Sequence, residues 1–131
     1  MKRPPLGHLW HVALRVRDLE ACEHFYTDVL GLTVEWRPDA DNVYLHGSRD
    51  NLALHRDPAA VSGGALDHIG FVLETPGAVD EWYAYLNEHA VVVEHAPKTH
   101  RDGARSLYCR DPEGHLVQLI YHPPLFPQPQ L

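Results

Sequence analysis

The chain contains an internal repeat, and this repeat limits the possible folds more than any other feature of the sequence. Residues 10–16 and 67–73 are both short apolar runs with a histidine in second place, His11 and His68. A helical pattern and then three strand-like runs follow each of these segments. A sequence that repeats one supersecondary unit folds into structurally similar copies. We therefore expect two modules with the same order of elements.

Each predicted helix begins after a capping residue. Asp18 precedes an apolar stripe with helical spacing, and the stripe ends at Gly31, which can adopt the positive φ that ends many helices. Thr75 followed by Pro76 marks the start of the second helix. Residues 87–90 contain no glycine, so the end of that helix is less well marked.

Three strands are expected after each helix, separated by turn residues such as Asp111-Pro112 and Gly114. The expected strands are 32–36, 42–46 and 51–55 in the first half, and 91–95, 105–110 and 116–121 in the second. A single β-α-β-β-β module would leave one sheet face bare, and two modules can close their bare faces around a shared cavity.

The predicted fold class is therefore α+β, with two β-α-β-β-β modules forming a paired, incompletely closed barrel with a central cavity. We expect one domain over residues 1–131, divided into module one at about 8–58, a linker at 59–65, module two at about 66–122 and a Pro-rich tail at 123–131.

Composition excludes several classes of protein. The chain has 131 residues and a formal net charge of −7, which argues against sequence-independent binding to nucleic acid. No run approaches the roughly 20 apolar residues of a membrane span, and the N-terminal charges are not followed by the apolar run of a secretory signal. Two cysteines, Cys22 and Cys109, are too few for a disulfide scaffold. We expect a reduced cytoplasmic protein that does not interact with membranes.

Four segments carry a resemblance to a known family: 11–20, 25–32, 67–71 and 108–119. They resemble the vicinal oxygen chelate superfamily, which includes glyoxalase I, extradiol dioxygenases, methylmalonyl-CoA epimerase and the fosfomycin- and bleomycin-resistance proteins. The resemblance implies paired modules, a small-molecule substrate or ligand, and a homodimer. It specifies the fold better than the reaction, because one fold can support many chemistries.

The resemblance also implies metal ligands at four matched positions, on the first and last strand of each module. These positions hold His11, Ala53, His68 and Gln118. Gln118 stands where the family normally has a glutamate, so the set has no carboxylate. One interpretation is a divalent metal (Zn, Ni, Co, Fe or Mn) bound by His11, His68 and Gln118. The alternative is that the histidines are hydrogen-bonded core residues and bind no metal.

Side-chain alternation along the strands predicts which residues face the cavity. His11, His68 and Gln118 face inward in this scheme. The predicted substrate contacts are Trp10, Arg15, Tyr44, His55 and Tyr108. His55 lies two residues beyond the ligand position, so it is either a substrate contact or a replacement ligand. Arg15 is expected to be buried, where an anionic ligand would compensate its charge. The remaining strand-end and turn histidines, His89, His95, His100, His115 and His122, are expected at the surface.

Two functions remain open from the sequence. The first is a small-molecule enzyme of the glyoxalase/dioxygenase type, a lyase, isomerase or dioxygenase whose metal chelates vicinal oxygens of the substrate. The missing carboxylate removes the usual general base and the 2-His-1-carboxylate triad, so no catalytic residue is assigned. The second is a metal-free protein that binds or sequesters a ligand, resembling the bleomycin-resistance proteins.

Overall fold

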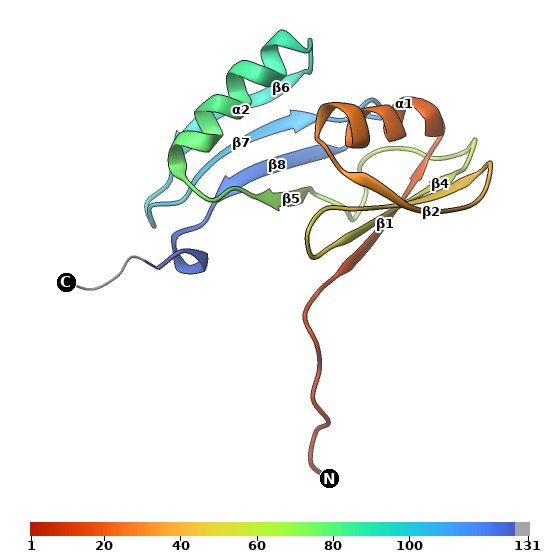
Figure 1. Ribbon diagram of the computed structural model, residues 1–131, viewed down its shortest axis with the longest axis horizontal. Coiled ribbons are helices and arrows are strands. Elements are labelled where there is room, and N and C mark those ends of the chain that lie inside the picture. Colours follow the sequence, from red (N-terminus) through yellow and green to blue (C-terminus); the bar gives the residue numbers. More distant parts are fainter. Residues whose placement is uncertain (128–131) are drawn as a thin grey trace. The chain divides into compact units, whose positions relative to one another are not determined.

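The computed structural model describes residues 1–127, and the chain forms two compact units, Met1–Val61 and Ser62–Leu131. Each unit contains one four-stranded sheet of mixed strand directions with a helix over one face (Figure 1). The α+β class and the repeated β-α-β-β-β order are confirmed, with two separate sheets rather than one closed barrel. None of the helices in residues 1–127 is long and apolar enough to cross a membrane.

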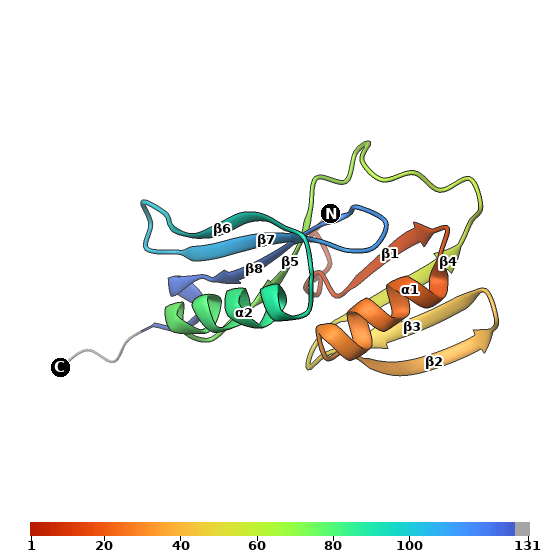
Figure 2. The ribbon, with the colours of Figure 1, turned by 90° about the horizontal axis from the view of Figure 1, so that it is seen from above.

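The first unit forms its sheet in the order β1-β4-β3-β2, with β1 parallel to β4 and the other pairs antiparallel. Figure 2 shows α1 lying over this sheet. The elements are β1 (His11–Val16), α1 (Leu19–His24), a π-helix (Phe25–Val29), β2 (Thr33–Asp39), β3 (Asn42–His46) and β4 (Asn51–Arg56).

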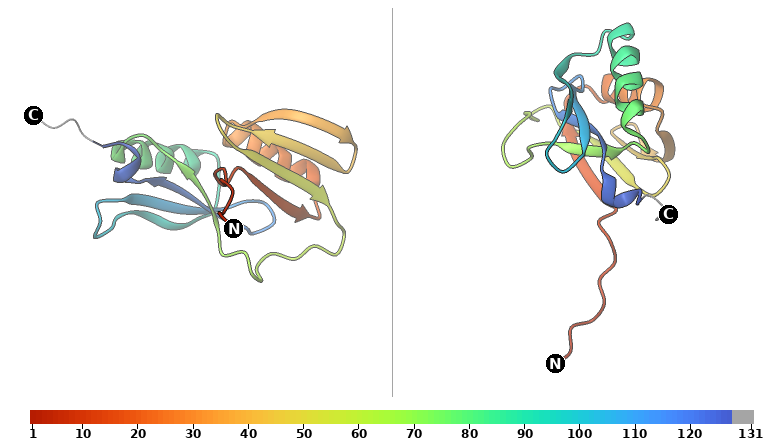
Figure 3. Two further views of the ribbon diagram at one scale, coloured as in Figure 1. Left: turned by 90° about the horizontal axis from the view of Figure 1, so that it is seen from below. Right: turned by 90° about the vertical axis from the view of Figure 1, so that its left-hand side faces the viewer.

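The second unit repeats this topology with the order β5-β8-β7-β6 and a parallel pair formed by β5 and β8. The left panel of Figure 3 shows α2 running along the sheet that contains β8. The elements are β5 (Ile69–Val72), α2 (Pro76–Glu88), β6 (Val93–Thr99), β7 (Arg105–Arg110), β8 (Leu116–Tyr121) and a 3₁₀ turn (Pro123–Leu125).

The strand registers of the two units match residue by residue. In the first unit, Ala53 of β4 pairs with Ala13 of β1 and with Tyr44 of β3. In the second unit, Gln118 of β8 pairs with Gly70 of β5 and with Tyr108 of β7. Ala53 and Gln118 therefore occupy equivalent positions, and each lies beside a tyrosine.

Both helices begin as the sequence predicts. The Asp18 carboxylate accepts a hydrogen bond of 3.0 Å from the amide of Ala21, and the Thr75 hydroxyl accepts one of 3.1 Å from the amide of Ala78. Each cap satisfies an amide that the first turn of a helix leaves without an intrahelical partner. The first helix does not continue as one α-helix to Gly31, because its second half, Phe25–Val29, is a π-helix.

The two helices end differently. Gly31 adopts a φ of 92° after the first helix, where no β carbon opposes that conformation. After the second helix, Ala90 adopts a φ of 55° and is the one non-glycine residue with positive φ in the described chain. An alanine in this region carries a steric cost that glycine avoids.

The helix-facing side of each sheet forms the core of its unit. Along β1, Leu14 and Val16 are buried while His11, Ala13 and Arg15 on the other face are exposed. This alternation confirms the predicted faces of β1. The buried helix residues are Leu19, Cys22, Phe25 and Tyr26 in the first unit, and Val79 and Leu86 in the second. Burying each large apolar side chain contributes about 1.5–3 kcal/mol to folding.

Two buried groups sit beside the turn that joins β7 to β8. Cys109 is fully buried, and its desolvation, together with the charge of Asp111, raises the pKa of the thiol to about 12. His115 was expected at the surface but is buried, and its Nδ1 lies 2.8 Å from a carboxylate oxygen of Asp111. That hydrogen bond raises the pKa of His115.

The Pro-rich segment is not a plain extended tail. Pro123–Leu125 forms a 3₁₀ turn, and the ring of Phe126 stacks on Tyr121 with centroids 6.0 Å apart. The first part of the Pro-rich tail therefore packs locally against the end of β8. Residues 128–131 of the predicted tail lie outside the described residues.

Candidate functional site

The face of each sheet that points away from its helix carries the candidate residues. In the first unit, His11 is the first member of a chain of hydrogen bonds. Its Nδ1 lies 2.6 Å from Oδ1 of Asn51, and Nδ2 of Asn51 donates to Glu35 over 2.9 Å. A carboxylate only accepts, so the Asn51 amide must direct its NH₂ toward Glu35 and its oxygen toward His11. His11 therefore carries its proton on Nδ1, and Nε2 keeps the lone pair that could bind a metal or accept a proton.

Aromatic rings surround Tyr44 on the same face. The Trp36 ring stacks on Tyr44 at a centroid distance of 5.3 Å, and the His55 ring meets Tyr44 edge-on at 5.9 Å. His11 stacks on the tyrosine at 6.3 Å, and Trp10 in turn lies 5.9 Å from His11. The Nδ1 of His55 is 2.6 Å from Oδ1 of Asn42. The first unit thus brings Trp10, His11, Tyr44 and His55 together as the sequence suggests.

Arg15 does not match its predicted environment. It lies on the expected face of β1, but its side chain is exposed rather than buried. The guanidinium therefore keeps its contact with water, and its burial supplies no argument for a bound anion. Its role as a substrate contact remains a prediction.

In the second unit, Tyr108 occupies the centre of the corresponding face. Nε2 of Gln118 donates a hydrogen bond of 2.9 Å to the tyrosine oxygen. His68 and His95 both meet the Tyr108 ring edge-on, at centroid distances of 5.3 Å and 5.5 Å. Two predicted metal ligands, His68 and Gln118, therefore lie against one tyrosine.

The hydrogen bonds of these two side chains show which of their polar atoms have no partner within residues 1–127. The Asp67 carboxylate holds Nδ1 of His68 at 2.6 Å, so Nε2 carries the lone pair. Gln118 uses its NH₂ group on Tyr108, which leaves its amide oxygen above Gly70, where a β carbon would lie 3.4 Å from that oxygen. An imidazole nitrogen and an amide oxygen are both able to bind a divalent metal, although neither brings negative charge.

Within residues 1–127, no group of three or more His, Cys, Asp or Glu side chains is placed to hold a metal ion. The second unit offers two neutral donor atoms. The Asp67 carboxylate is hydrogen-bonded to the other ring nitrogen of His68 and so orients the ring. A carboxylate in this position outside the ligand set fixes the histidine tautomer and the orientation of the ring. The donor set therefore fits a divalent metal in the types of its atoms but lacks the anionic ligand that strengthens most such sites.

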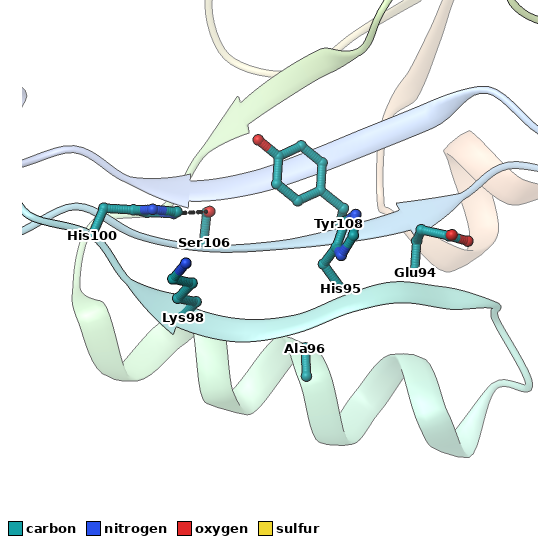
Figure 4. Close-up of a pocket in the computed structure, with 7 residues that line it drawn as sticks. All are labelled: Glu94, His95, Ala96, Lys98, His100, Ser106 and Tyr108. Atoms are coloured by element: carbon teal, nitrogen blue, oxygen red, sulfur yellow. Dashed lines mark hydrogen bonds between the residues drawn. The ribbon is translucent and has the colours of Figure 1, made fainter.

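Several residues of this face were not identified from the sequence. Glu35 and Trp36 are consecutive, yet one bonds to Asn51 and the other stacks on Tyr44. They can do this because the pairing of β2 with β3 is irregular between Val34 and Trp36. In the second unit, a pocket beside Tyr108 is lined by Glu94, His95, Ala96, Lys98, His100 and Ser106 (Figure 4). His95 and His100 were expected at the surface; both are exposed, but they line this pocket.

Most of the chain matches the model of one known protein family. The model of the Glyoxalase/Bleomycin resistance protein/Dioxygenase superfamily matches residues 8–119. The chain belongs to this superfamily. The match covers both units and confirms the resemblance seen in the repeated segments.

Curated members of the superfamily are related at moderate identity. Metallothiol transferase FosB of Staphylococcus saprophyticus is 29% identical over 113 residues, which cover 83% of this chain and 73% of FosB. Biphenyl-2,3-diol 1,2-dioxygenase 3 of Rhodococcus globerulus is 32% identical over 85% of this chain, but the match covers only 61% of the dioxygenase. The superfamily relatives therefore include a transferase and a longer dioxygenase.

Solved structures of the superfamily share the fold. Lactoylglutathione lyase from Agrobacterium tumefaciens has a TM-score of 0.75 and 27% identity, and the alignment covers 90% of this chain and 96% of the lyase. A glyoxalase/bleomycin resistance protein/dioxygenase from Nocardioides has a TM-score of 0.71 at 23% identity and covers all of this chain. The fold is thus that of the superfamily, and its members catalyse different reactions.

Proposed function

We propose that this protein is a small-molecule enzyme of the glyoxalase/dioxygenase type that depends on a divalent metal. The observation that carries the proposal is a pair of donor atoms on the second unit that have no hydrogen-bond partner among the described residues, Nε2 of His68 and the amide oxygen of Gln118. Each side chain is oriented by a hydrogen bond through its other polar atom, to Asp67 and Tyr108 respectively. Such preorganisation is what a ligand set needs before the metal arrives.

His11 is included as the third proposed ligand on the strength of the family resemblance. Its own contacts support the assignment, because the Glu35–Asn51 pair fixes the tautomer that exposes Nε2. His55 engages Asn42 through Nδ1 and is proposed as a substrate contact, together with Trp10, Arg15, Tyr44 and Tyr108.

A bound divalent metal would supply Lewis-acid stabilisation of negative charge on substrate oxygens. The chain's own contribution centres on Tyr108. Its oxygen accepts from Gln118, so the phenol hydrogen is available to donate to a substrate oxygen. The rings of His68 and His95 hold the phenol in place.

A second candidate function is metal-free binding or sequestration of a small aromatic ligand. The stacked Trp36 and Tyr44 rings of the first unit favour this function, because an exposed aromatic surface binds flat apolar molecules. The absence of a carboxylate among the proposed metal ligands also favours metal-free binding.

A calorimetric titration separates the two functions. Protein made without a histidine tag and stripped with a chelator is titrated with Zn²⁺, Ni²⁺, Co²⁺ or Mn²⁺. We expect Gln118→Glu to bind metal at least tenfold more tightly, about 1.4 kcal/mol, because an anionic oxygen replaces a neutral one. The substitution preserves the local contact, since Tyr108 can donate to the new carboxylate.

The control is His68→Ala in the Gln118→Glu background, which should remove the gain. Absence of metal binding in both the wild type and Gln118→Glu would reject metal dependence and favour the sequestering function. If metal binds, the loaded protein is then assayed with lactoylglutathione and with catechol, which represent two reaction classes of the superfamily.

We also propose that the chain forms a homodimer, as the resemblance implies. Light scattering at micromolar concentration should give about twice the chain mass of 14.9 kDa. A species of 14.9 kDa alone would contradict the proposal.

A further inference from the structure

One flank of α2 carries an aromatic notch, which is lined by Glu81, Trp82 and Tyr85 and has a volume of about 250 Å³. Residues three and four positions apart are neighbours on a helix surface, so Tyr85 lies beside both other residues. The rings of Trp82 and Tyr85 meet edge to face, with centroids 5.1 Å apart and an angle of 85° between their planes. The buried residues of α2 are Val79 and Leu86, so the α2 notch is not part of the core.

The carboxylate in the α2 notch is not neutralised by its own chain. Glu81 is exposed and forms no ion pair or hydrogen bond with any residue in 1–127. The adjacent Asp80 differs, because Arg105 binds both of its carboxylate oxygens, at 2.7 Å and 3.1 Å. The helix contains three acidic residues and no lysine or arginine. A carboxylate beside two aromatic rings attracts a cation through its charge and through the ring electrons.

The N-terminal arm, residues 1–10, has the complementary properties. All ten residues are exposed, and Figure 1 shows the arm as an extended segment that leads away from the sheet of its own unit. Lys2 and Arg3 are consecutive, the arm has no acidic residue, and neither cation forms an ion pair with any described residue. Pro4 and Pro5 follow directly. Prolines favour an extended helix that loses little entropy when it docks in an aromatic groove.

We propose that the N-terminal arm of one copy of the chain docks in the α2 notch of a second copy. Arg3 of the arm pairs with Glu81 and lies over the Trp82 ring, and the two prolines pack against the aromatic walls. The inference goes beyond the proposed enzyme, because it uses neither metal nor substrate. It rests on the proposed homodimer, for which it names a contact.

Charge and reach favour a second copy as the occupant. The chain has a formal net charge of −7, so two copies repel each other except where a cationic segment meets an acidic one. Eight residue steps separate Arg3 from His11, where β1 begins, and an extended chain of that length spans roughly 26 Å. That reach is enough to cross to a neighbouring molecule. Exchange of an identical element between copies is a low-cost route to association.

A mixed-isotope NMR experiment tests which copy supplies the arm. Leu6→Cys introduces a thiol for a maleimide nitroxide, and the native Cys22 and Cys109 are fully buried. The spin-labelled protein, at natural isotope abundance, is mixed with an equal amount of ¹⁵N-labelled wild type, and the two are refolded together from urea. We expect broadening of the Trp82 indole N–H and of the α2 amides in the ¹⁵N copy. Reduction of the nitroxide with ascorbate should remove it.

Charge variants give the matched control. Arg3→Glu in the spin-labelled copy should weaken docking about fivefold, because an exposed ion pair and a cation–π contact are lost. The broadening measured over a dilution series gives this change. Arg49→Glu makes the same charge change at an exposed site outside the arm and should have no effect. Combining Arg3→Glu in the labelled copy with Glu81→Arg in the ¹⁵N copy should restore the broadening.

Three results would overturn the inference. The first is broadening only when spin label and ¹⁵N are in the same chain, which would mean that the arm folds onto its own molecule. The second is no broadening in either sample, and the third is equal broadening with Arg3→Glu. A dimer by light scattering without broadening keeps the homodimer and rejects the arm contact. A species of 14.9 kDa without broadening rejects both.

Discussion

The two units share a backbone plan but present different chemistry on the face away from the helix. Tyr44 and Tyr108 occupy equivalent positions, and their neighbours differ. Trp36 pairs with Tyr44, whereas His95 pairs with Tyr108. Ala53 lies beside the first tyrosine and Gln118 beside the second. The first unit therefore offers an aromatic surface beside one candidate ligand, His11, and the second offers hydrogen-bond donors and two candidate ligands, His68 and Gln118.

This difference shows that the repeat preserves the core face of each sheet while the opposite face is free to change. Core positions must fill a fixed volume under the helix, so a substitution there is costly. Most of the candidate residues on the opposite face are partly or fully exposed, so the constraint there is weaker, with Ala53 as a fully buried exception. Exchanging residues between equivalent positions is therefore a direct way to test how far the two units are interchangeable.

The largest effect is expected when Ala53 of the first unit is replaced by glutamine, the residue that occupies the equivalent position in the second unit. Ala53 is 0% exposed, whereas Gln118 is half-buried. Ala53→Gln should lower the free energy of unfolding by about 1–3 kcal/mol, because the longer side chain overpacks its surroundings. Gln118→Ala should cost less, about 0.5–1.5 kcal/mol, because one hydrogen bond is lost where water can replace it. Urea denaturation measures both, and equal costs would contradict the difference in packing.

A pH-dependent effect is expected at the turn between β7 and β8. His115 is buried against Asp111, which raises the pKa of the histidine, so the pair stabilises the fold most below the unfolded pKa of about 6.5. That stabilisation is lost as the pH rises through the raised folded pKa. His115→Gln should therefore cost about 1.5 kcal/mol at pH 5.5 and less at pH 8.5.

Urea denaturation at the two pH values provides the measurement. The corresponding turn of the first unit has no histidine, and Asp50 accepts from the amide of Gly47 instead. Asp50→Asn is the matched control. Its cost in the free energy of unfolding should not decrease above pH 6.5 as the cost of His115→Gln does. A cost of His115→Gln that is equal at both pH values would contradict the charged pair.

The smallest effect concerns the ends of the two helices. Gly31→Ala should destabilise the protein by about 1 kcal/mol, because the new β carbon opposes a φ of 92° and nothing nearby would compensate. Ala90→Gly should stabilise it by a few tenths of a kcal/mol, since relief of strain is offset by the greater entropy of unfolded glycine. Thermal unfolding of both variants tests this, and shifts of the same sign would contradict it.

Much of the fold was predictable because local signals agreed with the repeat. The caps at Asp18 and Thr75 and the alternation along β1 all appear as expected. The π-helix at Phe25–Val29 was not predictable, because its apolar spacing resembles that of an α-helix. The positive φ of Ala90 was not predicted, because nothing in the alanine residue type indicates that conformation.

The positions of the candidate site residues could be predicted only on strands whose side chains alternate regularly between the two faces of the sheet. His11, His68 and Gln118 follow from regular strands and from the family resemblance. Glu35 and Lys98 could not be placed in this way, because the irregular pairing of β2 and β6 changes the face on which a residue lies. The hydrogen bond from Asn51 to Glu35 joins two strands that the sequence does not show to be close.

The burial of Cys109 has a practical consequence. Thiol oxidation and alkylation proceed through the thiolate, and a pKa of about 12 leaves only about one molecule in 100,000 in that form at pH 7. Cys22 is fully buried as well. The folded protein should therefore resist peroxide and maleimide reagents without added reductant, and the rate at which its thiols are labelled should report how often each unit opens.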